Sequence, residues 1–404
     1  MREEEILKQV LFAFSNTFST KSEVRWGNGR VYDAIIYYKT IPYVVVELKT
    51  YLNEPHSICN RLFEDRKVVN CYWCMVTDGS TCYLQNMHEE LFQCSLNDAI
   101  LKIQDIESIR RNIDDTKLQE VVYVLTKYGH EEFVNKLELV PTADSQPVIV
   151  FDSSQTEMEL FETIIGKPFN TYDEKIHKYT SLRTAFEMIN QCSFRMNGIA
   201  GMNDNSEGYY WDEAVTGKKQ EPKDTINDYF ISSFSTEYDN LTLWRLYGDD
   251  GKGVCLTFKV IKGSEISGMT LGAIKYMPKD DSNFEFFRTL DKTNFVYQDI
   301  EQWKCFFKSQ EYKEEKEYRL MLKKNENDLN VKESGYYITN SNSIINPYVT
   351  LNMNSGEFPL ELKTITFGPK FPEQKVNQLQ LFSLLRSKGL YRVKIQESNV
   401  ITYR

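Results

Sequence analysis

Residues 30–49 read Arg30-Val-Tyr-Asp33-Ala-Ile-Ile-Tyr-Tyr-Lys-Thr-Ile-Pro-Tyr-Val-Val-Val-Glu47-Leu-Lys49, and this stretch decides the fold of the first part of the chain. Its two runs are rich in β-branched and aromatic residues and are separated by Lys39-Thr40, which predicts two antiparallel strands at 31–38 and 41–48. Asp33 then lies on the strand beside Glu47, and the two-residue period of a strand directs Glu47 and Lys49 to one face. Charged side chains at the end of an apolar strand cost free energy unless they bind a ligand or form ion pairs.

These three side chains suit the hydrolysis of a phosphodiester bond. Asp33 and Glu47 offer the carboxylate oxygens that hard divalent cations prefer, so we predict that they bind Mg²⁺ or Mn²⁺. The Lys49 ammonium would orient the attacking water, which gives Asp33, Glu47 and Lys49 as the predicted catalytic residues. The alternative is an ion-paired strand surface on which Glu47 pairs with Lys49 or Arg30.

The same residues resemble the PD-(D/E)xK nuclease superfamily, and more closely the N-terminal nuclease domain of type I restriction endonuclease subunits. The pattern of that group stands here as Arg30, Asp33, Pro42 and Glu47-Leu-Lys49 over roughly residues 1–95, and Met75-Val-Thr-Asp-Gly79-Ser resembles its later strand and turn. The resemblance implies a restriction-endonuclease-like mixed sheet flanked by helices. It also implies a magnesium-dependent endonuclease that binds DNA in preference to RNA.

Two further elements of that family are matched less directly. Phe63-Glu64-Asp65-Arg66 stands where the family has Gln-x-x-x-Tyr, and Glu5 is the best match to a helix-borne glutamate that joins such sites. The resemblance therefore rests on the hairpin and its three charged residues.

Residues 175–323 carry five phrases that resemble a bacterial family of domains of unknown function. The family pattern includes N-D-P-F-E, W-x-x-Y and K-S-x-x-W-x-x-E-x-E-[WY]-R, and here Asn205-Ser206 replaces Pro-Phe and Tyr312 replaces the usual Trp. The phrases are Ile176-His-Lys-Tyr179-Thr-Ser181, Met202-Asn203-Asp204-Asn-Ser-Glu207, Ile231-Ser-Ser-Phe234-Ser235, Leu243-Trp244-Arg-Leu-Tyr247 with the turn and strand up to Phe258, and Lys308-Ser309-Gln-Glu-Tyr312-Lys-Glu-Glu315-Lys-Glu317-Tyr318-Arg319.

The layout of these phrases resembles that of ADP-ribosyltransferases, which bind NAD in a split β-sheet. In those enzymes a late glutamate stabilises the positive charge that develops on the ribose as nicotinamide leaves. The resemblance implies that His177, Tyr179 and Tyr247 bind the cofactor and that Glu317 is catalytic. The alternatives are a hydrogen-bonded structural histidine, a packed helix face at Tyr247, and Glu317 as part of a solvated charge run or as a partner of Arg319.

The pattern of apolar residues predicts an α/β fold followed by an α+β fold. We predict a nuclease-like domain at 1–95, a helical connector and linker at 96–154, and an α+β domain with a split β-sheet at 155–404. The linker prediction rests on Pro141-Thr-Ala-Asp-Ser-Gln-Pro147, the most linker-like segment of the chain. Strands are predicted at 229–234, 253–258, 317–322, 362–367 and 391–396, and turns at 194–208 and 249–253.

Composition narrows the class of protein. The 404 residues include 48 Lys and Arg against 58 Asp and Glu, so the net charge of −10 disfavours a basic nucleic-acid module, and DNA binding needs a local basic patch. No apolar run approaches the roughly 20 residues of a membrane span, and the acidic N-terminus lacks a secretory pattern, so we expect a cytoplasmic protein without a membrane partner. The 8 cysteines, Cys71 and Cys74 included, are expected to be free thiols in strands or cores.

Three functions from different classes remain open. The first is a metal-dependent DNA nuclease fused to a sensing or modifying domain, in bacterial antiviral defence against phage. The second is an NAD-using ADP-ribosyltransferase whose N-terminal domain only docks nucleic acid. The third is a non-catalytic interaction protein. A homo-oligomer and other defence proteins are partners compatible with each of them.

Overall fold

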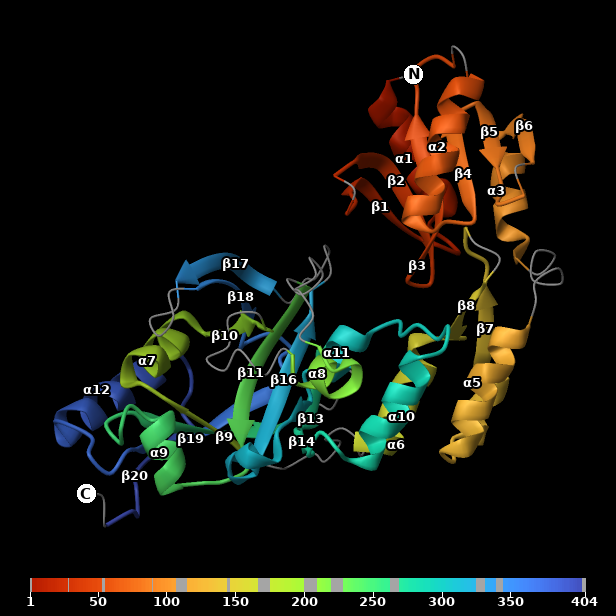
Figure 1. The fold of residues 1–404 in the computed structure, drawn as a ribbon. Helices are drawn as coiled ribbons and strands as arrows, with labels where there is room; N and C mark the ends of the chain where they lie inside the picture. The colour runs from red at the N-terminus through yellow and green to blue at the C-terminus, as the bar shows by residue number, and fades with distance from the viewer. Residues whose placement is uncertain are drawn as a thin grey trace. The chain divides into compact units, whose positions relative to one another are not determined.

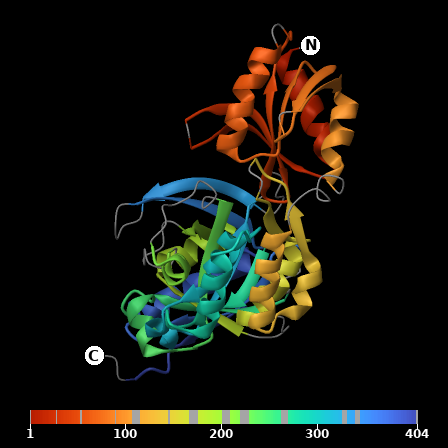
Figure 2. The ribbon, with the colours of Figure 1, turned by 45° about the vertical axis from the view of Figure 1, so that its right-hand side comes forward.

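A computed structural model describes the fold (Figures 1 and 2). It describes residues 2–27, 29–52, 55–88, 90–106, 115–143, 146–165, 175–199, 209–218, 228–261, 269–324, 331–338 and 344–401. The chain divides into two compact units, Met1–Leu160 with Phe286–Gln298, and Phe161–Glu285 with Asp299–Arg404. Each unit combines helices with a mixed β-sheet, which confirms the predicted fold class of mixed α and β structure. No helix of the described residues is long and apolar enough to cross a bilayer.

The first unit contains a six-stranded sheet in sequence order, β1-β2-β3-β4-β5-β6. Neighbouring strands are antiparallel except β3 and β4, which are parallel because helix α2 returns the chain between them. The predicted hairpin is confirmed, since β2 and β3 have the expected limits. The strands are β1 (Ser19–Arg25), β2 (Val31–Tyr38), β3 (Ile41–Leu48), β4 (Trp73–Thr77), β5 (Thr81–Gln85) and β6 (Leu91–Ser95).

Helices cover both faces of this sheet, which explains why its central strands are apolar throughout. Helices α1 (Glu3–Phe14) and α3 (Leu96–Gln104) pack against one face, where Ala34 and Ile36 are buried. Helix α2 (Pro55–Val69) packs against the other face, where Ile35 and Val45 are buried. A strand buried on both faces cannot alternate between apolar and polar residues.

The remainder of the first unit contains a short hairpin that the sequence did not predict. Helix α5 (Thr116–Lys127) and the 3₁₀-helix η1 (Glu131–Lys136) lead into antiparallel strands β7 (Leu137–Val140) and β8 (Val148–Phe151). The predicted linker, of which residues 144 and 145 lie outside the described part, therefore connects two paired strands. The domain limits at 95 and 154 stay a prediction.

The second unit is built on a ten-stranded sheet of order β17-β18-β10-β11-β9-β12-β19-β20, with β16 pairing with β11 and β13 pairing with β16. Its strands are β9 (Lys175–Thr180), β10 (Ser193–Gly198), β11 (Tyr229–Ser235), β12 (Val254–Val260), β13 (Met269–Ala273), β16 (Glu317–Lys323), β17 (Val331–Ile338), β18 (Ile345–Asn352), β19 (Leu360–Phe367) and β20 (Lys394–Glu397). Two strands pair outside it, β14 (Lys275–Tyr276) and β15 (Phe307–Lys308). The prediction of turns from 194 was wrong as far as Gly198, because this segment is strand β10.

Helices and short turns complete the second unit. Its largest core lies between the sheet and helices α7 and α12. The helices that begin in or belong to this unit are α7 (Leu182–Gln191), α8 (Tyr210–Thr216), α9 (Leu241–Leu246), α11 (Ile300–Lys304), the 3₁₀-helix η4 (Gln310–Glu315) and α12 (Gln374–Ser387), while α6 (Ser154–Ile165) and α10 (Ser282–Asp291) cross the limits of the two units.

The sheet forks at strand β11. This strand pairs with β16 along its whole length, from Tyr229 opposite Lys323 to Ser235 opposite Glu317. Among the described residues, it pairs on its other side with β10 at Ile231 and Phe230 and with β9 at Ser235. The edge of β11 from 232 to 234 is therefore free of strand pairing on that side, and a cavity opens there.

Candidate functional sites

The predicted nuclease residues lie together at the ends of β2 and β3. Asp33 Oδ2 accepts a hydrogen bond of 2.7 Å from the backbone N–H of Leu48. Lys49 Nζ lies 2.9 Å from Glu47 Oε1. The same oxygen lies 3.1 Å from a guanidinium nitrogen of Arg61, which belongs to helix α2.

The two carboxylates influence one another electrostatically. Burial raises the pKa of Asp33, the Leu48 N–H opposes this, and the negative charge of Glu47 raises that pKa further. A divalent cation would relieve this repulsion, so the donors fit the predicted metal chemistry. No cluster of three or more His, Cys, Asp or Glu side chains suited to a metal occurs among the described residues, and a cation here would therefore need water or phosphate oxygens as well.

Neighbouring charges differ from the sequence-based expectations in three respects. Arg30 forms an ion pair with Asp65 of α2 and not with Glu47. Glu5 accepts a hydrogen bond from the backbone of Arg2 at the start of α1, while the charge that reaches Asp33 from this helix is that of Glu3. Sequence reasoning missed Arg61, although its place on the helix that follows the Glu-x-Lys strand was a usable signal.

The second site is the cavity at the fork of the ten-stranded sheet. Its volume is about 320 Å³, and its lining comes from β9, β10, β11, β17, α9, β15, η4 and β16. His177, Tyr179, Tyr247 and Glu317, which lie far apart in the sequence, all line it. The structure thus brings the four predicted C-terminal residues to one cavity.

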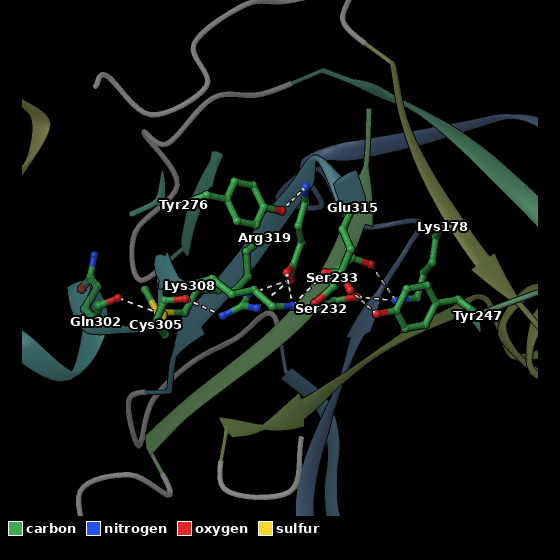
Figure 3. A network of polar contacts seen from close by, with 12 residues as sticks. Lys178, Ser232, Ser233, Tyr247, Tyr276, Gln302, Cys305, Lys308, Glu315 and Arg319 are labelled. Carbon is green, nitrogen blue, oxygen red and sulfur yellow. Dashed lines mark hydrogen bonds and ion pairs between the residues drawn. The ribbon is translucent and has the colours of Figure 1, made fainter. Parts of the chain in front are cut away.

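Glu317 is the centre of a buried ion-pair network. Its partners Arg319 and Lys308 are labelled in Figure 3. Arg319 Nε and Nη2 donate to Glu317 Oε1 at 2.9 and 2.7 Å, and Arg319 also donates to the carbonyl of Cys305. Lys308 Nζ lies 3.4 Å from Glu317 Oε2. Burial opposes ionisation of Glu317, but Arg319 and Lys308 outweigh it and lower its pKa, so Glu317 is an ionised, fully engaged carboxylate.

Glu315 links this network to the wall of the cavity. Its Oε1 accepts a 2.6 Å hydrogen bond from the Tyr247 hydroxyl, and its Oε2 lies 2.7 Å from Lys308 Nζ. Glu315 is less buried than Glu317 and lines the same cavity. Sequence reasoning assigned Glu315 to a charge run and missed it, because the 3₁₀-helix η4 that turns it inward is visible only in the fold.

His177 and Tyr179 have structural partners. His177 Nδ1 lies 3.0 Å from Thr257 Oγ1, and burial lowers its pKa to about 4, so the imidazole is neutral near pH 7. The Tyr179 hydroxyl donates to the carbonyl of Glu237 at 2.9 Å and accepts from the N–H of Asn240 at 2.9 Å. Tyr179 therefore anchors the start of helix α9 as well as lining the cavity.

Lys178 lies between these two residues in the chain, and sequence reasoning did not identify it as a site residue. Strand alternation directs it away from His177 and Tyr179, to the face that carries Phe194 and Phe234. Its Nζ donates to Ser232 Oγ at 2.8 Å and to the Ser233 carbonyl at 3.2 Å. A lysine at a core-facing position of an apolar strand was the signal that could have revealed it.

Comparison with known proteins assigns part of this unit to a family without a known activity. Residues 243–320 match the family described as "Protein of unknown function (DUF2971)". That segment contains Tyr247, Lys308, Glu315, Glu317 and Arg319, so the whole ion-pair network lies within it. Of the five phrases, Met202–Glu207 lies outside the described residues.

The other comparisons found no relatives. No curated protein and no solved structure matched the chain significantly. No nuclease family matched the first unit, so its nuclease resemblance stays a proposal.

The cysteines have no special arrangement. All eight are free thiols, and Cys71 and Cys74 are both buried beside the sheet of the first unit. Burial raises the pKa of Cys74 to about 12, which makes it a neutral core residue at physiological pH. The prediction of free thiols is confirmed.

Proposed function

We propose that the first unit is a metal-dependent nuclease that hydrolyses phosphodiester bonds of DNA. The observation that supports this best is the approach of Asp33, Glu47 and Lys49 at adjacent strand ends. Mg²⁺ or Mn²⁺ between Asp33 and Glu47 would polarise the scissile phosphate and activate a water molecule. Lys49 and Arg61, which now share Glu47, would bind the negative charge of the substrate.

Arg30 extends the positive surface of this proposed site. Its side chain is half-exposed and pairs with Asp65 on the same helix that carries Arg61. A chain with a net charge of −10 needs local positive charge to bind DNA, and a metal ion that takes up the charge of Glu47 would leave Lys49 and Arg61 to supply it. A nuclease joined to a sensing or modifying unit suits cytoplasmic defence of bacteria against phage.

Plasmid nicking tests this proposal. The full-length protein should nick or degrade DNA with Mg²⁺ or Mn²⁺ and should stop when a chelator is added. Asp33→Asn and Lys49→Met should each reduce the rate at least about 100-fold, because each removes a metal ligand or a stabilising charge. Glu64→Gln, an exposed carboxylate on α2 paired with Lys67, is the matched control and should retain activity.

The outcome against the proposal is equally clear. Nicking that is unchanged in both variants would come from a contaminant or from another site. Titration of Mn²⁺ adds an independent readout, since Asp33→Asn should weaken cation binding whether or not DNA is cleaved. RNA in place of DNA tests the preference for DNA.

A second candidate function is an NAD-using transfer reaction in the second unit. The position of Glu317, Glu315 and Tyr247 at a cavity in a forked sheet favours it. Release of nicotinamide from NAD, with Glu315→Gln and Tyr247→Phe as variants, is the assay. No release and no NAD binding would remove this candidate and would favour a non-catalytic interaction role for the unit.

A further inference from the structure

Lys178, in the wall of the cavity at the fork, is partly buried and has no carboxylate within ion-pair distance among the described residues, although the negative charge of Glu317 acts on it from further away. Lys178 Nζ is bonded only to the Ser232 hydroxyl and the Ser233 carbonyl, both of which are neutral. Phe194 and Phe234 flank it, with ring centroids 5.9 and 5.3 Å from Nζ. A buried ammonium without a counter-ion is costly, and that cost falls when an anion binds beside it.

The nearby carboxylates are already engaged by other cations. Glu317 pairs with Arg319 and Lys308, and Glu315 pairs with Lys308. Lys178 and Lys308 line the cavity with Glu315 and Glu317, and Arg319, which does not line it, also pairs with Glu317. Of these three cations, Lys178 is the one whose contacts are to neutral groups only.

Other groups in the cavity suit an anion with several oxygens. Ser232 Oγ accepts from Lys178 and keeps its own O–H to donate to an acceptor that enters the cavity, whereas the Ser233 hydroxyl lies against the Glu317 carboxylate. None of the described strands pairs with β11 on this side from 232 to 234, so its edge is available as well, apart from the Ser233 carbonyl that accepts from Lys178. An ammonium next to hydroxyl and backbone donors is a common arrangement for phosphate.

The aromatic side chains of the cavity suit a planar ring. Tyr247, Tyr312 and Tyr337 line it together with the polar groups, and aromatic faces stack on the bases of nucleotides. The cavity volume of about 320 Å³ lies at the lower end of the range for ligand sites, which suits a small nucleotide.

We propose that this cavity binds a nucleotide, with Lys178 as the counter-charge of its phosphate. The inference is independent of the nuclease proposal, which concerns the other unit. It also holds without any transfer chemistry, since NAD is only one molecule that contains a nucleotide phosphate. A cavity that binds nucleotides would give the second unit a sensing role.

Calorimetric titration of the full-length protein with AMP tests the proposal, with adenosine and inorganic phosphate as comparison ligands. AMP should bind more tightly than either, because only AMP has both the phosphate and the base. Lys178→Gln should weaken AMP binding about 10- to 100-fold, the effect of losing one charged hydrogen bond, and should leave adenosine binding unchanged. Lys175→Gln removes an exposed lysine from the same strand and should bind AMP normally.

A second measurement uses the wild-type protein and does not depend on the folding of a variant. Burial lowers the pKa of Lys178 to about 8, so its amine is available to an acylating reagent near that pH. Saturating AMP should reduce acylation of Lys178, read by peptide mass spectrometry, and leave Lys175 unaffected. Absence of protection, absence of AMP binding at millimolar concentration, or binding of inorganic phosphate as tight as that of AMP would overturn the proposal.

Discussion

Replacing Glu317 by Gln should destabilise the second unit, because the change leaves two buried cations with less compensation. Arg319 is 1% exposed and directs two donors at the Glu317 carboxylate, and Lys308 is 3% exposed. Breaking one side of a buried ion pair costs about 3–5 kcal/mol. The remaining bonds of Arg319 to Cys305 and of Lys308 to Glu315 place the expected loss near the lower figure, about 3 kcal/mol.

Thermal unfolding followed by tryptophan fluorescence measures this loss, since Trp211, Trp244 and Trp303 all belong to the second unit. A loss of about 3 kcal/mol corresponds to a fall in melting temperature of about 6–12 °C for a unit of this size. The matched control is Glu361→Gln, which breaks a half-exposed pair with Lys363 and should cost less than about 1 kcal/mol. If the melting temperature of Glu317→Gln lies within 2 °C of that of the wild type, the loss is below about 1 kcal/mol, and the explanation by a buried ion-pair network is refuted.

A double variant and a pH series isolate the pair itself. The double variant Glu317→Gln/Arg319→Met should lose less free energy of unfolding than the two single variants do in sum. The difference should be at least about 1 kcal/mol. Because the folded state lowers the pKa of Glu317 below 4.5, its contribution is present above that pH and is lost as the pH falls from 4.5 through the folded value. The Glu317→Gln variant should therefore lose less stability on acidification than the wild type does.

Three smaller predictions follow from other parts of the chain. Gly253→Ala should lower the free energy of unfolding by several kcal/mol, because the added Cβ would lie 2.3 Å from a backbone oxygen. Gly356→Ala is the control, since its Cβ would have no atom within 4 Å and the change should be nearly neutral. Urea unfolding measures both. Cys71 and Cys74 should resist iodoacetamide until the protein is denatured, as peptide mapping would detect. Binding of Mn²⁺ needs ionised Asp33, and the pKa of Asp33 is raised above its ordinary value of 3.8. As the pH is lowered, the affinity for Mn²⁺ should therefore begin to fall at a pH above 3.8.

Local patterns in the sequence predicted the elements that form from local residues. The hairpin at 31–48, the strand that begins at Glu317 and the turn before Gly253 all follow from alternation and turn residues, and all three are present. Strand β18 was missed, because Asn346 and Pro347 give it no strand pattern, and its pairing with β10 and β17 supplies what the local sequence lacks.

The two candidate sites also differ in how far local sequence determines them. Asp33, Glu47 and Lys49 lie on one hairpin, so their approach follows from a two-residue period and a short connection. The partners of Glu317 depend on the long-range fold, since Lys308 comes from β15 and only Arg319 shares its strand. Sequence reasoning named Arg319 as an alternative partner of Glu317, and this pair is present, but it could not indicate that Lys308 also contacts the carboxylate.

This difference changes which glutamate is the better candidate for chemistry in the cavity. A carboxylate that stabilises a developing positive charge must have an oxygen free to approach the substrate. Both oxygens of Glu317 already contact cations, and its loss is expected to destabilise the unit by about 3 kcal/mol, so an inactive Glu317→Gln protein would prove little about catalysis. Glu315 holds Tyr247 at the cavity wall through one oxygen and Lys308 through the other, and its carboxylate is more exposed than that of Glu317. Glu315 is therefore the carboxylate whose substitution separates a chemical role from a structural one.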